Sequence, residues 1–338
     1  MILVSQYKVS VIFPIYNGEK YISNLINSMK KQTINFENLE IIFIDNKSTD
    51  NSLNLLKSLD NKYSNVKLVV LDKHYPTPGK SRNMGIITST ADYIMMCDED
   101  DLFTEDYVER MFNAISSNKL DLVSSRYTVV TDKKSLNNSF LDNENSDILI
   151  NSIREYPEII QTLANLTVWN KIYNKKFIID NDIKFIEDHW NEDYLFSLEC
   201  YIKAQGIMLF THYSGYLYKI HPNSQTQKNI SKEELDDDLF DTLSQTKEFL
   251  LKNNFEVYPY ISELLVTYIK FFLRSNYNKN DFNYIYNKFK PWLKGYSIKT
   301  RLINLSLLFN IIINITIKIF SINKIFVSIA SKLYKMIT

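Results

Sequence analysis

The first third of the chain alternates short apolar runs with stretches of helical periodicity, and this rhythm restricts the possible folds more than any other feature. Between the runs, apolar residues recur every three or four positions, as at Tyr21, Leu25 and Met29. The runs themselves have the composition of buried strands and cover residues 9–13, 40–44, 66–71 and 93–97. Strands that alternate with helices in this way predict an α/β fold with a doubly wound, mostly parallel sheet.

The pattern becomes less regular after residue 120. We expect the following elements there: a strand within 121–130, a loop over 131–147, a helix over 191–204 and paired short strands within 207–220. Beyond about residue 231 the sequence has the periodicity of helices. We therefore expect two domains, an α/β domain over residues 1–228 and a C-terminal helical region over residues 229–338.

Composition excludes several classes of protein. The chain has 39 basic and 39 acidic side chains and a formal net charge of zero, which argues against a general nucleic-acid binder. Its two cysteines, Cys97 and Cys200, have no metal-ligand spacing, so neither a disulfide framework nor a structural zinc site is expected. The first residues lack the pattern of a signal peptide, and we expect a cytoplasmic protein.

Acidic residues are concentrated directly after the apolar run 93–97, where Asp98, Glu99, Asp100 and Asp101 follow one another. In an open α/β sheet, ligands bind beyond the carboxyl ends of the strands. Carboxylate oxygens suit a hard divalent cation such as Mg²⁺ or Mn²⁺, which often completes its shell with phosphate. The alternative is a solvated acidic turn that also caps the following helix.

Seven segments together resemble family 2 glycosyltransferases of the GT-A fold, in that family's order and spacing. The resemblance extends over about residues 8–226. Its segments are 9–17 (VSVIFPIYN), 42–52 (IFIDNKSTDNS), 79–86 (GKSRNMGI), 96–102 (MCDEDDL), 169–173 (WNKIY), 191–196 (NEDYLF) and 218–226 (YKIHPNSQT). It implies a nucleotide-binding GT-A domain that uses a nucleotide sugar.

The resemblance also implies which residues bind the donor. Asp45 would bind the uracil or ribose, and Asn46 stands where the family often has a second Asp. The residues expected to line or approach the nucleotide pocket are Pro14, Tyr16, Asn17, Glu19, Arg82, Asn83, Asp98 and Glu99. For Asn17 the alternative is an N-cap of the next helix, and for Arg82 an ion pair with a surface acid.

By the same resemblance, Asp98 and Asp100 hold a divalent metal, Mn²⁺ or Mg²⁺, that neutralises the departing diphosphate. Asp101 would orient its neighbours. Three residues near the end of the matched region are further candidates for contact with metal or phosphate: His221, Lys219 and, more weakly, Ser224.

The pair Glu192–Asp193 begins a predicted helix. The resemblance makes Asp193 the general base, because inverting transfer is a single displacement in which one carboxylate accepts the proton of the acceptor hydroxyl. The alternative is that both acids only stabilise a helix N-terminus.

The C-terminal tail combines apolar and basic residues. Residues 282–338 contain no acid, and the apolar stretch 302–329 carries a polar line at Asn310, Asn314 and Lys318. This pattern favours an amphipathic helix on the cytoplasmic face of an anionic membrane over a spanning helix. Packing on the catalytic domain or on a second subunit of a homo-oligomer is the alternative.

These features together predict an inverting glycosyltransferase that moves a hexosyl or N-acetylhexosaminyl group from a UDP-sugar to a hydroxyl of a glycan or lipid-linked acceptor, in synthesis of a bacterial surface polysaccharide. The QxxRW signature of processive relatives is missing, which favours transfer of a single sugar. The competing interpretations are a catalytically inactive GT-A scaffold that binds sugar or nucleotide, and a glycoside hydrolase, which would need two carboxylates flanking the bond and no nucleotide pocket.

Overall fold

The computed structural model describes residues 6–131, 135–137, 146–156, 166–187, 192–220, 232–257 and 260–261. Side chains of residues 135–137 and 232–239 are not among those described. The chain divides into two compact units, Met1–Pro222 and Asn223–Thr338. His221, Ser224 and the tail 282–338 lie outside the described residues.

An eight-stranded sheet forms the centre of the first unit. Its strand order is β3-β2-β1-β4-β10-β6-β11-β9. The strands are β1 (Val9–Ile15), β2 (Leu39–Asp45), β3 (Val66–Val70), β4 (Tyr93–Met96), β6 (Leu122–Ser124), β9 (Ile148–Ile150), β10 (Lys171–Asn174) and β11 (Ile207–Leu209). The first four are parallel, and every residue of β1 and β2 is buried. The predicted doubly wound, mostly parallel sheet is confirmed.

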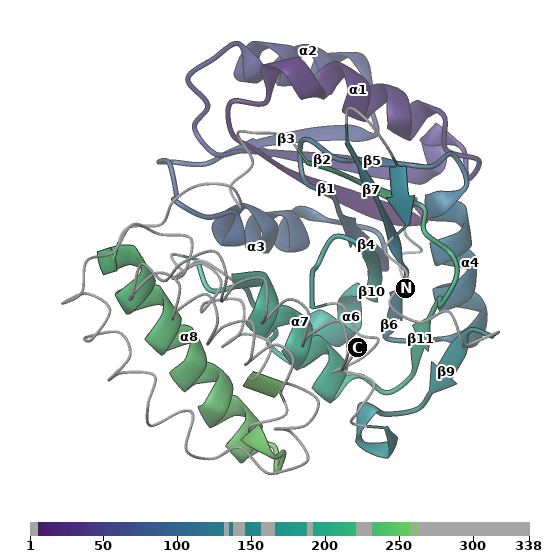
Figure 1. Ribbon diagram of the computed structural model, residues 1–338. Helices are drawn as coiled ribbons and strands as arrows, with labels where there is room; N and C mark the ends of the chain where they lie inside the picture. The colour runs from purple at the N-terminus through teal and green to yellow at the C-terminus, as the bar shows by residue number, and fades with distance from the viewer. Residues whose placement is uncertain are drawn as a thin grey trace, which may run out of the picture. The chain divides into compact units, whose positions relative to one another are not determined.

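Helices cover both faces of these parallel strands. Figure 1 shows α1 (Glu19–Lys30) and α2 (Ser52–Lys62) on one side of β1–β3 and α3 (Gly79–Thr88) on the other. Gly85 lets α3 pack directly on β1, because a Cβ at this position would lie 2.3 Å from Cγ2 of Ile12. The chain leaves β1 for β2 and β3, then crosses back to β4 on the other side of β1. This reversal is a switch point, where ligands bind in such sheets.

This unit also contains α4 (Tyr107–Asn118), α6 (Lys175–Asp180), α7 (Glu192–Lys203) and two 3-10 turns, Phe36–Asn38 and Ile153–Glu155. The helix α4 begins three residues after Thr104, whose hydroxyl donates to the Asp106 carboxylate at 2.9 Å. The strand β10 was not predicted. It runs antiparallel to both β4 and β6.

A second sheet has the order β5-β12-β7-β8 and contains β5 (Leu102–Phe103), β7 (Tyr127–Val130), β8 (Ser135–Asn137) and β12 (Tyr216–Lys219). Three expectations were wrong here. Residues 121–130 form two strands in different sheets, because the chain leaves the large sheet at Ser125, whose N–H donates to Asn170 O. The strands within 207–220 do not pair with each other, and β8 lies within the predicted loop 131–147.

The second unit contains α8 (Lys232–Lys252), within the region where helices were expected. Leu243 and Leu250 are buried on this helix. Within the described parts of the chain, no helix has the length and apolarity needed to cross a membrane.

Candidate functional site

The residues after β1, β2 and β4 meet at the carboxyl edge of the sheet. The backbone N–H of Asn46 donates to Ile15 O at 2.8 Å, and the N–H of Cys97 donates to Ile12 O at 3.0 Å. The turns that follow these strands therefore begin side by side, at the switch point. They carry most of the candidate residues named from the sequence.

The acidic loop after β4 is held from its buried side. The carboxylate of Asp101 is fully buried and accepts hydrogen bonds from the Tyr216 hydroxyl at 2.6 Å and from the backbone N–H of Lys219 at 2.7 Å. Burial and the neighbouring acids Asp98 and Asp100 raise the pKa of Asp101 well above its ordinary value. Asp101 thus anchors the loop to β12, while the side chain of Asp98 keeps 32% exposure.

Glu99 connects this loop to the turn after β1. Its carboxylate accepts from the backbone N–H of Tyr16 at 2.8 Å. The contact needs a glycine at position 18, because a Cβ there would lie 2.8 Å from Glu99 Oε2. Burial, with added repulsion from Asp100 and Asp98, raises the pKa of Glu99 to about 8. Glu99 therefore faces Tyr16 and ties two walls of the candidate nucleotide pocket together.

Tyr16 stacks on a histidine that the sequence did not single out. The rings of Tyr16 and His74 lie 4.1 Å apart with an interplanar angle of 28°, and both residues are exposed. The loop carrying His74 is fixed by Asn46, whose Nδ2 donates to Tyr75 O and whose Oδ1 accepts from Tyr75 N, each at 2.8 Å. An Asp could accept but not donate, so these two bonds explain the amide where the resemblance leads one to expect an acid. No motif marks His74.

Asn17 and Glu19 fasten the loop that follows β2. Asn17 has a positive φ of 56°, and its side-chain oxygen accepts from the backbone N–H groups of Thr49 at 2.8 Å and Asp50 at 3.3 Å. It does not cap α1, for which Gly18 is the N-cap residue. The Glu19 carboxylate accepts from the N–H of Asn51 at 3.2 Å. Both side chains thus bind backbone of the next loop.

Two other expected pocket residues are buried. Pro14 lies within β1. Asp45 is fully buried at the end of β2, and its carboxylate accepts from the backbone N–H of Ser48 at 3.3 Å. The structure therefore places Asp45 beneath the turn of residues 45–48.

Arg82 joins the acidic loop to the start of α7. The guanidinium is 4% exposed; its Nη2 donates to Asp98 Oδ1 at 2.8 Å and its Nη1 to Glu192 Oε1 at 2.7 Å. Burial works against its charge, but Asp98, Glu192 and Asp193 outweigh it, and the pKa of Arg82 is raised. The expected alternative, an exposed Arg paired with a surface acid, does not describe this side chain.

The close packing of α3 places Arg82 there. Gly79 lies against the segment before α7, because a Cβ at position 79 would be 2.2 Å from Ile186 O. Asn83 binds the same segment, donating to Phe185 O and accepting from Phe185 N, each at 2.9 Å. Asn83 therefore holds α3 against the segment that precedes the candidate base Asp193.

Glu192 and Asp193 are the first two residues of α7. Glu192 is buried and Asp193 is partly buried. Burial raises the pKa of both carboxyl groups, while Arg82 opposes the shift. A carboxylate with a raised pKa is a better proton acceptor at neutral pH than an ordinary one.

The donor set after β4 fits a divalent cation that is shared with a diphosphate. Asp98 and Asp100 are both partly exposed, and Mg²⁺ is commonly held by one or two carboxylates together with phosphate oxygens. Among the residues that the structure describes, no group of three His, Cys, Asp or Glu side chains is arranged to hold a metal without such help. Glu99 and Asp101 are turned to Tyr16 and Tyr216.

The chain is similar to known proteins in sequence and in fold. The profile described as "Glycosyl transferase family 2" matches residues 10–182. Poly(ribitol-phosphate) beta-glucosyltransferase of Bacillus spizizenii is 30% identical over 62% of this chain and 32% of its own length. Staphylococcus aureus TarS, a poly(ribitol-phosphate) beta-N-acetylglucosaminyltransferase, is 30% identical over 62% of this chain and 35% of its own length. The chain thus spans about a third of each of these relatives.

Staphylococcus aureus TarP, which carries the same enzymatic description as TarS, is 30% identical over 67% of both chains. Among solved structures, residues 1–349 of Staphylococcus aureus TarS share the fold with a TM-score of 0.61 and 22% identity, over 91% of this chain and 80% of that one. The profile covers half of the sequence, and TarP matches over two thirds of its own length. The chain therefore belongs to glycosyl transferase family 2.

Proposed function

We propose that the protein transfers one sugar from a UDP-sugar to a hydroxyl of a glycan or polyol-phosphate acceptor, with inversion at the anomeric carbon. The observation that carries this proposal is the double ion pair of Arg82. One buried guanidinium contacts both the acidic loop proposed to face the diphosphate and the helix turn that carries the proposed base. Donor-side and acceptor-side carboxylates thereby belong to one site.

The proposed roles follow from position. Tyr16, with the walls fixed by Asn17, Glu19 and Glu99, lies at the edge of the nucleotide pocket. Asp98 and Asp100 would hold a divalent cation, which supplies positive charge for the departing diphosphate. Arg82 keeps Asp98 and Glu192 in place, and Asp193 accepts the proton of the attacking hydroxyl. Inverting transfer requires no covalent enzyme intermediate, so one base suffices.

The acceptor class is inferred from relatives. TarS, TarP and the Bacillus spizizenii enzyme are named as poly(ribitol-phosphate) glycosyltransferases, and Bacillus subtilis GgaA, 26% identical over 79% of this chain, is named as a minor teichoic acid biosynthesis protein. We therefore propose a teichoic-acid-type polymer as acceptor. A structure of TarS has been solved with UDP-GlcNAc, which makes UDP-GlcNAc the first donor to test.

Residues 1–228 are proposed as the catalytic domain and 229–338 as a helical region that binds the cytoplasmic face of the membrane or a second subunit. The acid-free, basic sequence of residues 282–338 supports the membrane proposal. Sedimentation of the full chain with anionic, but not zwitterionic, vesicles tests it. If the full chain does not sediment with anionic vesicles at either low or high salt, the membrane proposal is contradicted.

The test of function uses the full chain with Mn²⁺, UDP-GlcNAc or UDP-glucose, and poly(ribitol phosphate) or poly(glycerol phosphate). We expect acceptor-dependent release of UDP, a mass increase of the acceptor by one sugar per site, a β-linked product from the α-linked donor, and loss of turnover with EDTA. Asp193→Asn is the inactive control. UDP binding without transfer to any acceptor would favour the inactive scaffold, and cleavage of glycans without nucleotide would favour a hydrolase.

A further inference from the structure

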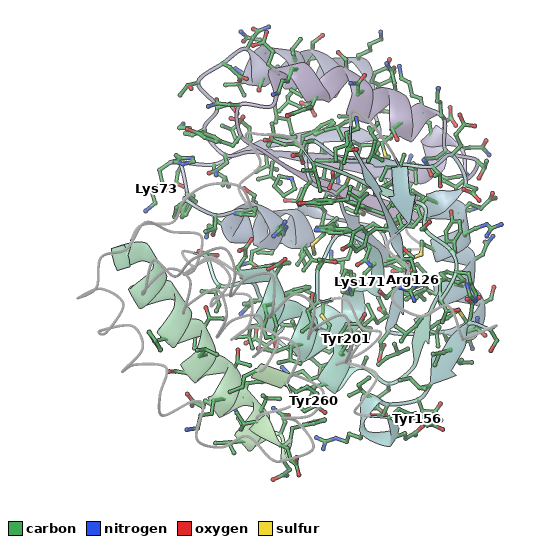
Figure 2. All side chains as sticks on the ribbon, in the orientation of Figure 1. Lys73, Arg126, Tyr156, Lys171, Tyr201 and Tyr260 are labelled. Atoms are coloured by element: carbon green, nitrogen blue, oxygen red, sulfur yellow. The ribbon has the colours of Figure 1, made fainter. Side chains whose placement is uncertain are left out.

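Lys171 is a second buried cation near α7. Lys171, the first residue of β10, is fully buried. Its Nζ donates to Thr167 O and, at 2.7 Å, to Asn170 Oδ1. It also lies 5.6 Å from the centre of the Tyr201 ring, which extends from α7 (both residues are labelled in Figure 2). Burying an ammonium is costly unless its charge and donors are used.

The carbonyl that Lys171 holds is shared with α7. Thr167 O also accepts from the hydroxyl of Ser197, at 3.1 Å. Ser197 is four residues after Asp193 on α7, so the two side chains project from the same face of the helix in successive turns. Lys171 and Ser197 thus both donate to the carbonyl of Thr167, one helical turn from the proposed base.

The segment around Lys171 also reaches the acidic loop. Trp169 stacks on Tyr216 with ring centres 4.3 Å apart, and the Tyr216 hydroxyl donates to Asp101. Asn170 is bound to Ser125, where the two sheets part. Residues 167–171 therefore contact the helix that carries Asp193 through Ser197 and Tyr201, and are linked through Tyr216 to the loop proposed to hold the metal.

The charge of Lys171 acts on Asp193. Burial lowers the pKa of Lys171 to about 7, with Cys200 and Asp193 opposing the shift. In return Lys171 lowers the pKa of Asp193, which burial raises. The groups that face these two residues include Cys200 and Tyr201 of α7 on the Lys171 side, and Arg82, Asp98 and Glu192 on the Asp193 side. Below about pH 7 the ammonium is present and favours the ionised base.

Resting on the proposed transfer reaction, we propose that Lys171 is a positioning residue for Asp193: its ammonium fixes the 167–170 segment against α7 and supplies positive charge beside the base. The resemblance covers this segment without giving Lys171 a role. Two substitutions remove the charge and differ in whether a hydrogen-bond donor remains. Lys171→Gln keeps a donor without charge, and Lys171→Met removes both.

The matched control is Lys175, whose Nζ also donates to a backbone carbonyl, Ser89 O, in a half-buried setting where burial lowers its pKa. Its charged neighbours are Glu40, Lys67 and Asp92, and Asp193 is not among those that shift its pKa. Lys175→Met should reduce stability without altering the pH dependence of turnover.

The experiment measures kcat against pH for the wild type, Lys171→Gln, Lys171→Met and Lys175→Met, with circular dichroism to confirm folding. We expect the acid limb of the kcat profile to move to higher pH by about one unit in both Lys171 variants, the lower end of the effect of a nearby charge. It should stay in place in Lys175→Met. An unmoved limb in a folded Lys171→Gln overturns the proposal.

If Lys171→Met does not fold, the position of the acid limb in Lys171→Gln tests the proposal by itself. A wild type that releases no UDP with any donor overturns the proposed function first, and a fully active Asp193→Asn overturns Asp193 as base. Both outcomes are distinct from an unmoved acid limb in an active enzyme.

Discussion

Arg82 Nη1 lies 2.7 Å from Glu192 Oε1, and this contact joins α3 to the first turn of α7 across 110 residues of sequence. The other terminal nitrogen of the same guanidinium holds Asp98. The planar fork of an arginine can serve two carboxylates in fixed directions, which a lysine cannot do. The site therefore depends on one buried cation for the relative placement of its donor-side and base-side acids.

Replacing Arg82 should affect stability and turnover together. In Arg82→Met the buried Glu192 and the partly exposed Asp98 lose their partner, and breaking a buried pair costs about 3–5 kcal/mol. Arg82→Lys keeps the charge but not the fork, and we expect it to fold and to lose most of its activity. Urea unfolding and UDP release measure the two effects.

Lys80 provides the control on the same helix. Its ion pair with Glu187 is partly exposed, and such pairs contribute about 0–1 kcal/mol. Lys80→Met should therefore change the free energy of unfolding little. If Lys80→Met and Arg82→Met lower the free energy of unfolding equally, the two ion pairs of Arg82 do not contribute more than an exposed pair.

Asp193→Asn removes the proposed base while preserving size. General-base catalysis contributes about 10²–10⁴ in rate, so kcat should fall by that factor. The dissociation constant for UDP, measured by calorimetry with Mn²⁺, should stay within about twofold, because the proposed role of Asp193 concerns the acceptor and the substitution leaves the proposed donor contacts in place. Glu199→Gln, also on α7 and paired with Lys203, is the control and should remain active. A kcat within threefold of wild type would remove Asp193 from the mechanism.

Much of this site was predictable because strand ends mark it. The apolar runs before Tyr16, Asp45 and Asp98 are buried strands, and their polar successors meet at the switch point as expected. The strand β10 was missed because its first residue is Lys171, and a buried lysine interrupts an apolar pattern.

The partners of the site residues were less predictable. Arg82 was expected near the nucleotide, but its place between two acids depends on Glu192, 110 positions away, which no local pattern encodes. His74 lies in a loop fixed by Asn46 through backbone bonds. A sequence shows such a loop only as an irregular stretch.

The raised pKa of Glu99 predicts a change of stability with pH. Its pKa in the folded protein is about 8, against an ordinary value of 4.5, so the folded state keeps a proton that the unfolded state releases. The contribution is therefore fully present below about pH 4.5 and is lost as pH rises through about 8. Glu99→Gln cannot ionise and still accepts from Tyr16, so its stability relative to wild type should increase from pH 5 to pH 8.5.

Thermal unfolding of both proteins at the two pH values measures this difference. Glu105→Gln, at an exposed position, is the control and should follow the wild type at both pH values. A Glu99→Gln variant whose difference from wild type is the same at pH 5 and pH 8.5 would contradict the raised pKa of Glu99.

Asn46→Asp tests whether the amide is needed to build the pocket wall. The variant keeps the acceptor for Tyr75 N but loses the donor to Tyr75 O and sets a carboxylate against that carbonyl. Losing the hydrogen bond to the part-buried Tyr75 O costs about 0.5–1.5 kcal/mol, which loosens the loop that carries His74 and its stack on Tyr16. Affinity for UDP should fall about tenfold, the equivalent of about 1.4 kcal/mol, while the kcat of saturated enzyme changes less. Asn54→Asp, at an exposed position on α2, should bind UDP like the wild type. Tighter binding by Asn46→Asp would instead mean that position 46 contacts the nucleotide directly and that an acid serves it better.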